Sequence, residues 1–143
     1  MSIATQVAQA VVVELAGHEF SQQFEPKMLV LPDFKPVELE ILRVSVAPRT
    51  LEIERQTRSS TKFLVTIDIG IQKRIEGTPE DTVATMGTLV DEIAEFLQTA
   101  DLSQFPAAQL VNIVNDPLYV PEHLQQKQSF TSILSLKYVL LGP

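Results

Sequence analysis

The sequence contains no cysteine, two histidines and five scattered glycines. Without cysteine the chain has no disulfide, no thiolate metal ligand and no thiol nucleophile. The glycines do not gather into a phosphate-binding loop, which needs several closely spaced backbone amides. No apolar run reaches the roughly 20 residues that a membrane-spanning helix needs. Residues 1–18 lack the basic start of a signal peptide, so we expect no membrane association and a protein made in the cytoplasm.

The composition is that of a folded protein. The 143 residues fit one domain, 1–143, with an apolar fraction of 45% and a charged fraction of 20%. The formal net charge is −7, which works against non-specific association with nucleic acid, because phosphate binding draws on clustered lysine and arginine.

Two segments have the apolar spacing of helices. Residues 2–15 carry an apolar stripe with Ser2 as N-cap and end at Gly17. Thr78 is the N-cap of the second helix, and Pro79 occupies its first position. Its stripe runs from Val83 to Leu97, and Gly87 within it is expected to allow close packing against a sheet.

Five segments are predicted as strands. They are residues 27–31, 39–46, 63–71, 110–114 and 130–140, of which 63–71 shows the clearest alternation. Prolines mark a turn at 32–36 and an irregular loop at 115–124. The prediction is an α+β fold: a mainly antiparallel sheet of four to five strands, two helices packed on one face, and a long charged hairpin over residues 47–62.

Candidate catalytic groups are few. His123 with Asp116 and either Ser103 or Ser129 forms a conceivable triad, but no nucleophile-elbow sequence surrounds either serine. Asp116, Glu122 and His123 are conceivable metal ligands for a small hydrolase, without the tight spacing of structural metal sites. Acidic residues of the second helix read as its solvent face. We expect no enzyme and no cofactor; a metal-dependent hydrolase and a regulatory module with an apolar pocket remain alternatives.

The charged hairpin is the most unusual segment. Arginines among its glutamates offer bidentate donors for carboxylates on another chain. A solvated hairpin and a nucleic-acid grip are the other interpretations, and the second is disfavoured because no stacking aromatic is nearby. The residues predicted to contact another subunit or partner are Arg49, Glu52, Glu54, Arg55 and Arg58.

Three stretches resemble a known family. "RVSVAPRTLEIERQTR", "IDIGIQKRI" and "VNDPLYVPEHL…FTSILSLKYVL", within residues 43–140, are similar to tail terminators (tail-completion proteins), or related neck proteins, of tailed bacteriophages. The resemblance implies a virion protein, assembled in the host cytoplasm, that forms a ring of usually six subunits. Such a ring caps the head-proximal end of the tail tube, stops tube polymerisation and docks to the neck or connector.

The resemblance also implies partners and a second contact region. The partners are the chain itself, the tail tube protein, the neck or connector protein and, in contractile tails, the sheath. DNA passes through the ring without specific binding, since surplus negative charge repels phosphates. On this interpretation the residues that dock to a neighbour in the loop are Asp116, Tyr119, Glu122 and His123.

Overall fold

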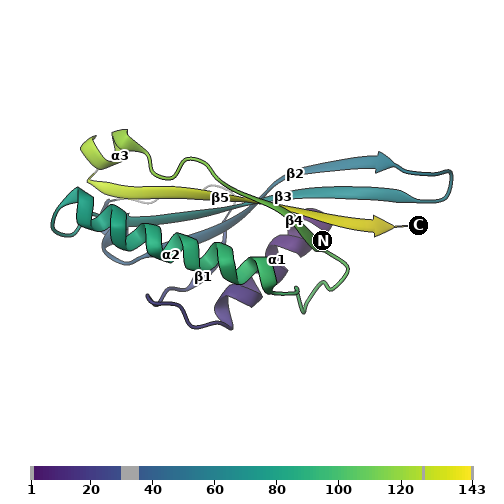
Figure 1. Cartoon of the computed structure of the whole chain (residues 1–143), viewed down its shortest axis with the longest axis horizontal. Coiled ribbons are helices and arrows are strands. Elements are labelled where there is room, and N and C mark those ends of the chain that lie inside the picture. The colour runs from purple at the N-terminus through teal and green to yellow at the C-terminus, as the bar shows by residue number, and fades with distance from the viewer. Residues whose placement is uncertain (1, 30–35, 127, 143) are drawn as a thin grey trace.

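The computed structural model describes residues 2–29, 36–126 and 128–142, and its centre is one five-stranded sheet. The strand order is β1-β2-β3-β5-β4 (Figure 1). β1 lies parallel to β2, and all other neighbours are antiparallel. The strands are β1 Pro26–Met28, β2 Arg43–Arg55, β3 Thr61–Arg74, β4 Gln109–Asn115 and β5 Ser129–Gly142.

Two long helices, α1 Ile3–Ala16 and α2 Pro79–Thr99, cover part of one face of this sheet (Figure 1). Both begin at the predicted caps. The Ser2 Oγ accepts a hydrogen bond from the Thr5 amide, and the Thr78 Oγ1 accepts one from the Asp81 amide, each at 3.2 Å. These helices and the sheet confirm the predicted α+β class.

Strand alternation forms the core. Val65, Ile67, Ile69 and Ile71 of β3 are all buried, and so are their partners across β5 and the partners Val44 and Val46 across β2. Side chains of successive strand residues point to opposite faces, so one apolar face of β3 meets α1 and α2. The helices contribute buried residues to the same cluster, among them Val11.

The structure corrects several local predictions. Residues 39–42 are not strand: Pro36–Glu40 forms a 3-10 helix, η1, and β2 begins only at Arg43, although Leu39 and Leu42 are both buried. Residues 121–124 are not irregular loop. They belong to a third helix, α3 Pro121–Gln126, in which Pro121 holds the first helical position that proline tolerates.

The hairpin is mostly strand. Of residues 47–62, which were predicted as a connection, only 56–60 lie between β2 and β3. The ladder shifts register between Pro48 and Thr50 and then continues to the pair Arg55 and Thr61. The shift lies at Pro48, because proline cannot donate a hydrogen bond to the ladder. The predicted turn at 32–36, and the end of the predicted strand 27–31, lie largely outside the described residues.

The sheet is longer than the layer of helices beneath it. The paired ends of β2, β3 and β5 extend beyond α1 and α2 at one end of the molecule (Figure 1). α3 lies at the other end, near the start of β5. Among the described residues, no helix has the length and apolar character needed to cross a bilayer.

Candidate functional site

The projecting end of the sheet, which we call the distal hairpin, comprises residues 49–62. Its tip is ordered by Thr57, whose Oγ1 accepts hydrogen bonds from the amides of Ser59 and Ser60 at 3.3 and 3.1 Å. The Gln56 amide also donates to the Ser60 carbonyl at 3.1 Å. β5 backs the hairpin, since Thr61 pairs with Gly142. The distal hairpin is therefore part of a three-stranded ribbon and not an isolated loop.

Apolar and charged side chains alternate along this ribbon. Leu51 and Ile53 pair with Val65 and Phe63, so they share the face that is covered by helices elsewhere in the sheet. No helix covers them as fully here, and Ile53 is 62% exposed. On the opposite face Glu52 and Glu54 pair with Leu64 and Lys62. Every residue from 49 to 59 is exposed.

Arg49 is engaged within the chain. Its Nη1 lies 2.5 Å from Asp68 Oδ2, and the Ser135 Oγ donates to Asp68 Oδ1 at 2.7 Å. The hydrogen bond to Asp68 and the charge of its carboxylate raise the pKa of Arg49 above its usual value. The guanidinium thus ties the root of the distal hairpin to the middle strands, which distinguishes Arg49 from the other four predicted hairpin residues.

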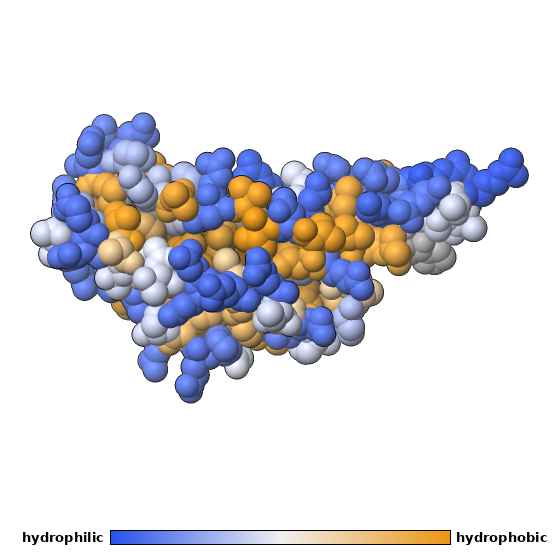
Figure 2. Space-filling view, in the orientation of Figure 1, coloured by the Kyte–Doolittle hydropathy of each residue, from blue (hydrophilic) through white to orange (hydrophobic). Residues whose placement is uncertain are grey.

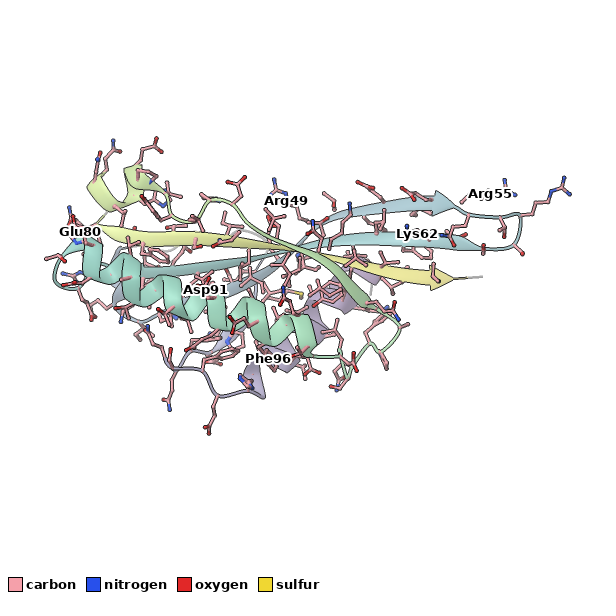
Figure 3. The ribbon with its side chains drawn as sticks, viewed as in Figure 1. Arg49, Arg55, Lys62, Glu80, Asp91 and Phe96 are labelled. Carbon is pink, nitrogen blue, oxygen red and sulfur yellow. The ribbon has the colours of Figure 1, made fainter. Side chains whose placement is uncertain are left out.

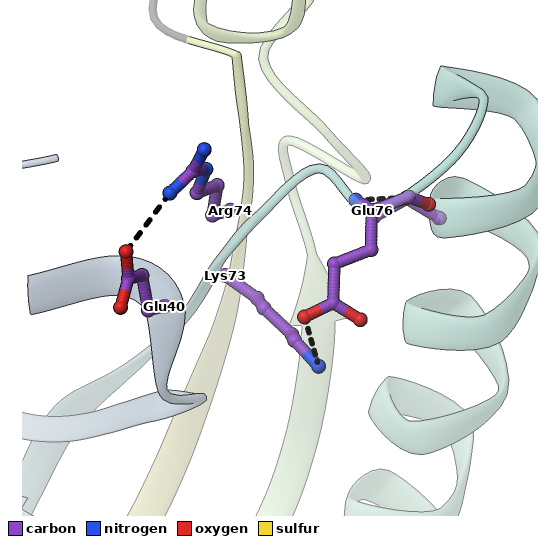
Figure 4. A network of polar contacts seen from close by, with 5 residues as sticks. Glu40, Lys73, Arg74 and Glu76 are labelled. Atoms are coloured by element: carbon purple, nitrogen blue, oxygen red, sulfur yellow. Dashed lines mark hydrogen bonds and ion pairs between the residues drawn. The ribbon is translucent and has the colours of Figure 1, made fainter. Parts of the chain in front are cut away.

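The remaining charges of the distal hairpin have no ion-pair partner among the described residues. These are Glu52, Glu54, Arg55, Arg58 and Lys62. Lys62 was not among the predicted contact residues, although it faces the same side as Glu54. At the other end of β3, by contrast, the Arg74 Nη1 lies 3.0 Å from Glu40 and the Lys73 Nζ lies 3.6 Å from Glu76 (Figure 4).

The second predicted group surrounds α3. The Asp116 amide donates to the Ile133 carbonyl at 3.1 Å, and His123 Nδ1 lies 2.8 Å from Thr131 Oγ1. Tyr119 is half-exposed, and Glu122 is exposed in the first turn of α3. The structure thus brings these four residues to one end of β5.

Sequence reasoning missed the residue that organises this loop. The Asn115 Nδ2 donates to the carbonyl of Ile133 and to the Ser132 Oγ, each at 2.9 Å. Neighbouring Leu118 is 66% exposed. An asparagine before aspartate and proline predicts a turn, but it does not predict which carbonyls its amide reaches.

The tip of the distal hairpin and the group around α3 lie at opposite ends of the molecule, and Arg49 lies between them (Figure 3). The ladder places Thr61 and Gln72, the partner of Thr131, 11 residues apart on β3, or about 36 Å at about 3.3 Å per residue. Figure 3 shows Arg55 and Glu80 at the two extremes. The groups do not converge on one cleft, and they are spaced as two separate contact surfaces of one subunit.

A shallow groove of about 350 Å³ separates α2 from the segment after β4. Gly87 lines it together with Leu118, Tyr119 and Phe130. A Cβ built on Gly87 meets no atom within 4 Å, so the prediction that Gly87 allows close packing against the sheet is wrong. Its small size leaves the groove open.

Charge is unevenly divided along the chain. Residues 75–126 contain nine aspartates or glutamates and neither lysine nor arginine. The distal hairpin contains four basic and two acidic residues. Because the whole chain has a net charge of −7, the distal hairpin is a locally basic region on an acidic protein.

Among the residues that the structure describes, no group of three or more histidines, aspartates or glutamates is placed to hold a metal ion. No protein-family model matches the chain, and no curated protein matches it significantly.

Proposed function

We propose that this protein is a structural subunit of a homo-oligomeric ring. The observation that carries the proposal is the distal hairpin, which extends past the helices with exposed apolar side chains. Its Arg55, Arg58 and Lys62 have no ion-pair partner among the described residues. Exposed apolar residues that form a defined surface commonly mark a protein contact. A ribbon braced by three strands and by the Arg49–Asp68 pair presents that surface in one orientation.

A ring needs two different surfaces on each subunit. Cyclic symmetry produces a heterologous interface, in which one patch meets another patch on the next copy. The basic distal hairpin includes the end of β2, and β4, which belongs to the acidic segment 75–126, lies on the opposite side of the sheet. Charge pairs between such surfaces set register and partner choice more than they set affinity.

The role that we propose for the ring is that of a phage tail terminator. This step is supported by the resemblance of residues 43–140 to terminators and related neck proteins. The ring would cap the tail tube at its head-proximal end, end tube growth, and dock to the neck or connector, with the sheath as a further partner in contractile tails. The acidic character of the chain fits a channel that lets DNA pass without binding it. The protein would then reside in the virion.

Charge reversal of the distal hairpin tests ring formation. Purified wild-type protein is expected to elute as an oligomer in gel filtration with light scattering, and negative-stain electron microscopy is expected to show closed rings. The double variant Arg55→Glu/Arg58→Glu should be monomeric, because its tip repels the acidic surface of the next copy. The matched control is Lys27→Glu, a charge reversal at an exposed residue of β1.

A wild-type protein that remains monomeric at tens of micromolar would refute the proposal, as would a double variant that assembles like the wild type. The position of the ring in an assembled particle then separates the two related roles. Direct contact with the last ring of tube subunits supports a terminator, whereas contact with the connector alone identifies a neck or head-closure protein.

A further inference from the structure

The outer edge of β4 is free. β4 pairs only with β5, and no described backbone group outside the sheet hydrogen-bonds to its residues 109–114. Its seven residues, QLVNIVN, contain no charge and no proline. Val111 is 56% exposed, and Val114 is also exposed. Figure 2 shows apolar residues in a broken band over the side where β4 lies.

Such an edge is unusual. An exposed edge strand offers unpaired amides and carbonyls to any other strand, and proteins normally protect it with lysine, proline, a bulge or a covering segment. β4 has only a register shift between Leu110 and Asn112. Its composition favours pairing with another strand.

The opposite side of the sheet has a second free edge. β1 pairs with β2 only at Val44, Ser45 and Val46. Beyond that point residues 49–55 of β2, of which Arg49 is the unpaired residue at the register shift and 50–55 pair with β3, have no described strand on the other side. This free edge also spans seven residues, and it belongs to the distal hairpin.

Strand directions make these two edges compatible. Between them lie β2, β3, β5 and β4, four strands in strictly antiparallel order. β2 and β4 therefore run in opposite directions. If neighbouring copies are related by rotation about an axis along the strands, β2 of one copy lies antiparallel to β4 of the next, and the same junction repeats around a ring.

The two edges also lie at nearly the same position along the strand direction. The ladders place Asn112 level with Thr50, through Lys137 and Thr66. Glu52 is the middle residue of the free β2 edge, so an offset of two residues aligns the two edges along their whole length. Closed sheets of tilted strands require a stagger of this kind.

The opposite directions and matching positions of the two free edges identify a second copy of this chain as the occupant. Two proteins of net charge −7 repel each other in general, but the segment that would meet β4 is the basic distal hairpin, and β4 itself has no charge to oppose it. The pairing also continues the face that carries Leu51 and Ile53 with Leu110 and Ile113 of β4, whose ladder partners Tyr138 and Leu136 are buried.

The geometry points to an intersubunit β-sheet: the outer edge of β4, Gln109–Asn115, pairs antiparallel with residues 49–55 of β2 from the next copy. This inference rests on the proposed ring and specifies how its subunits join. Main-chain hydrogen bonds along the edge supply the contact, and the side chains of the distal hairpin select the partner.

Cysteine cross-linking tests the pairing, because the chain has no cysteine of its own. Asn112→Cys in one preparation is mixed with Thr50→Cys, Glu52→Cys or Glu54→Cys in another, and the mixtures are reassembled and oxidised. Directly opposed residues on one face have the Cβ separation that a disulfide accepts. One of the three mixtures is expected to cross-link in most of its chains, and this mixture reports the register. Ile53→Cys is the matched control, because its side chain points to the other face.

A second experiment measures how a charge introduced on β4 changes the oligomeric fraction. Val114→Lys places a charge on β4, and Val13→Lys makes the same change at an exposed position of α1. Val114→Lys is expected to reduce the oligomeric fraction at least tenfold, while Val13→Lys should assemble like the wild type. Circular dichroism melting of both variants shows whether the subunit itself remains folded.

The outcomes separate the inference from the proposed function. A wild-type monomer defeats both. Rings that form without any cross-link between β2 and β4, and that tolerate Val114→Lys, overturn the intersubunit sheet and leave the ring intact. Cross-linking of Asn112→Cys with itself shows that two β4 edges pair symmetrically, and this result also overturns the inference.

Discussion

The two ends of the sheet use the same strands differently. At the end near η1 and α3, Ile69 and Ile71 are fully buried, and Arg74 has an acidic partner within the chain. At the distal end, the same alternation of β2 leaves Ile53 62% exposed, and Arg55 has no described ion-pair partner. The difference lies in what packs against the strands, because the backbone ladder is continuous through both ends.

The same alternation of apolar residues therefore serves folding at one end of the sheet and association at the other. At the covered end, apolar burial is satisfied within the chain and contributes to the stability of the monomer. At the distal end, the same residue types remain in water until another chain arrives, so they contribute to association. A mutation should therefore affect folding at one end and assembly at the other.

The largest expected effect comes from one substitution made at both ends. Ile69→Ala should lower the free energy of unfolding by about 2–5 kcal/mol, because it leaves a cavity in the core. Ile53→Ala should lower it by less than about 0.5 kcal/mol in the monomer, as expected for an exposed site. Urea denaturation at low protein concentration measures both values. Equal losses at the two positions would contradict the distinction between the ends.

The dependence of stability on pH tests the burial of Tyr138 in the part of the sheet that the helices cover. Burial raises the pKa of the Tyr138 phenol, and the nearby carboxylate of Glu14 adds to the rise. The unfolded chain loses this proton near pH 10, so stability is unaffected below about pH 10 and is lost as the pH rises further, by up to about 1.4 kcal/mol per pH unit. Tyr138→Phe should remove this part of the loss.

The phenol also bears on stability at neutral pH. The Tyr138 hydroxyl is buried and has no hydrogen-bond partner among the described residues. Tyr138→Phe should therefore leave the free energy of unfolding at pH 7 unchanged or raise it by about 1 kcal/mol. Thermal unfolding of the two proteins at pH 7 and at pH 10.5 measures both effects, and a clear destabilisation of the variant at pH 7 would contradict them.

A smaller effect on stability is expected at the root of the distal hairpin, where Asp68 binds both Arg49 and Ser135. Ser135→Ala removes the hydrogen bond to Asp68, the carboxylate that also holds Arg49. The expected loss is about 1 kcal/mol, because Asp68 keeps its arginine partner and lies near enough to the surface to bind water. Hydrogen exchange of the distal hairpin should become faster in this variant. Unchanged exchange would show that Asp68 does not brace the root of the hairpin.

The smallest change expected is a gain. Gly87 lies inside α2, where a Cβ meets no atom within 4 Å. Gly87→Ala should raise the free energy of unfolding by about 0.5–1 kcal/mol, because alanine restricts the unfolded chain and favours the helix. Chemical denaturation measures the gain. A loss of stability would show that the backbone at Gly87 requires glycine.

Elements with a strong repeating pattern were predictable. Five alternating apolar residues placed β3, and the caps Ser2 and Thr78 placed the starts of α1 and α2. Short segments with prolines were not. Pro121 reads as a loop residue, although it can equally start a helix, and Leu42 continues the alternation of Val44 and Val46, although the strand begins only at Arg43.

The candidate site was predictable only in part. The charged residues around Arg55 stand out in the sequence, but nothing in it shows that Arg49 is held by Asp68, 19 positions further along. The free edge of β4 was missed for a related reason. An uncharged apolar run reads the same in a central strand as in an edge strand, and only the strand order distinguishes them.

By itself, the amino-acid sequence determined the α+β class, the two long helices, the core face of β3 and the uneven charge, because these depend on local periodicity and composition. The tertiary structure alone decided that the distal hairpin extends past the helices, that its basic tip lies at the opposite end from α3, and that β4 and the outer part of β2 each have one side with no neighbouring strand among the described residues. Those features depend on which strands become neighbours and on how far each helix reaches. They are long-range outcomes that no local pattern encodes.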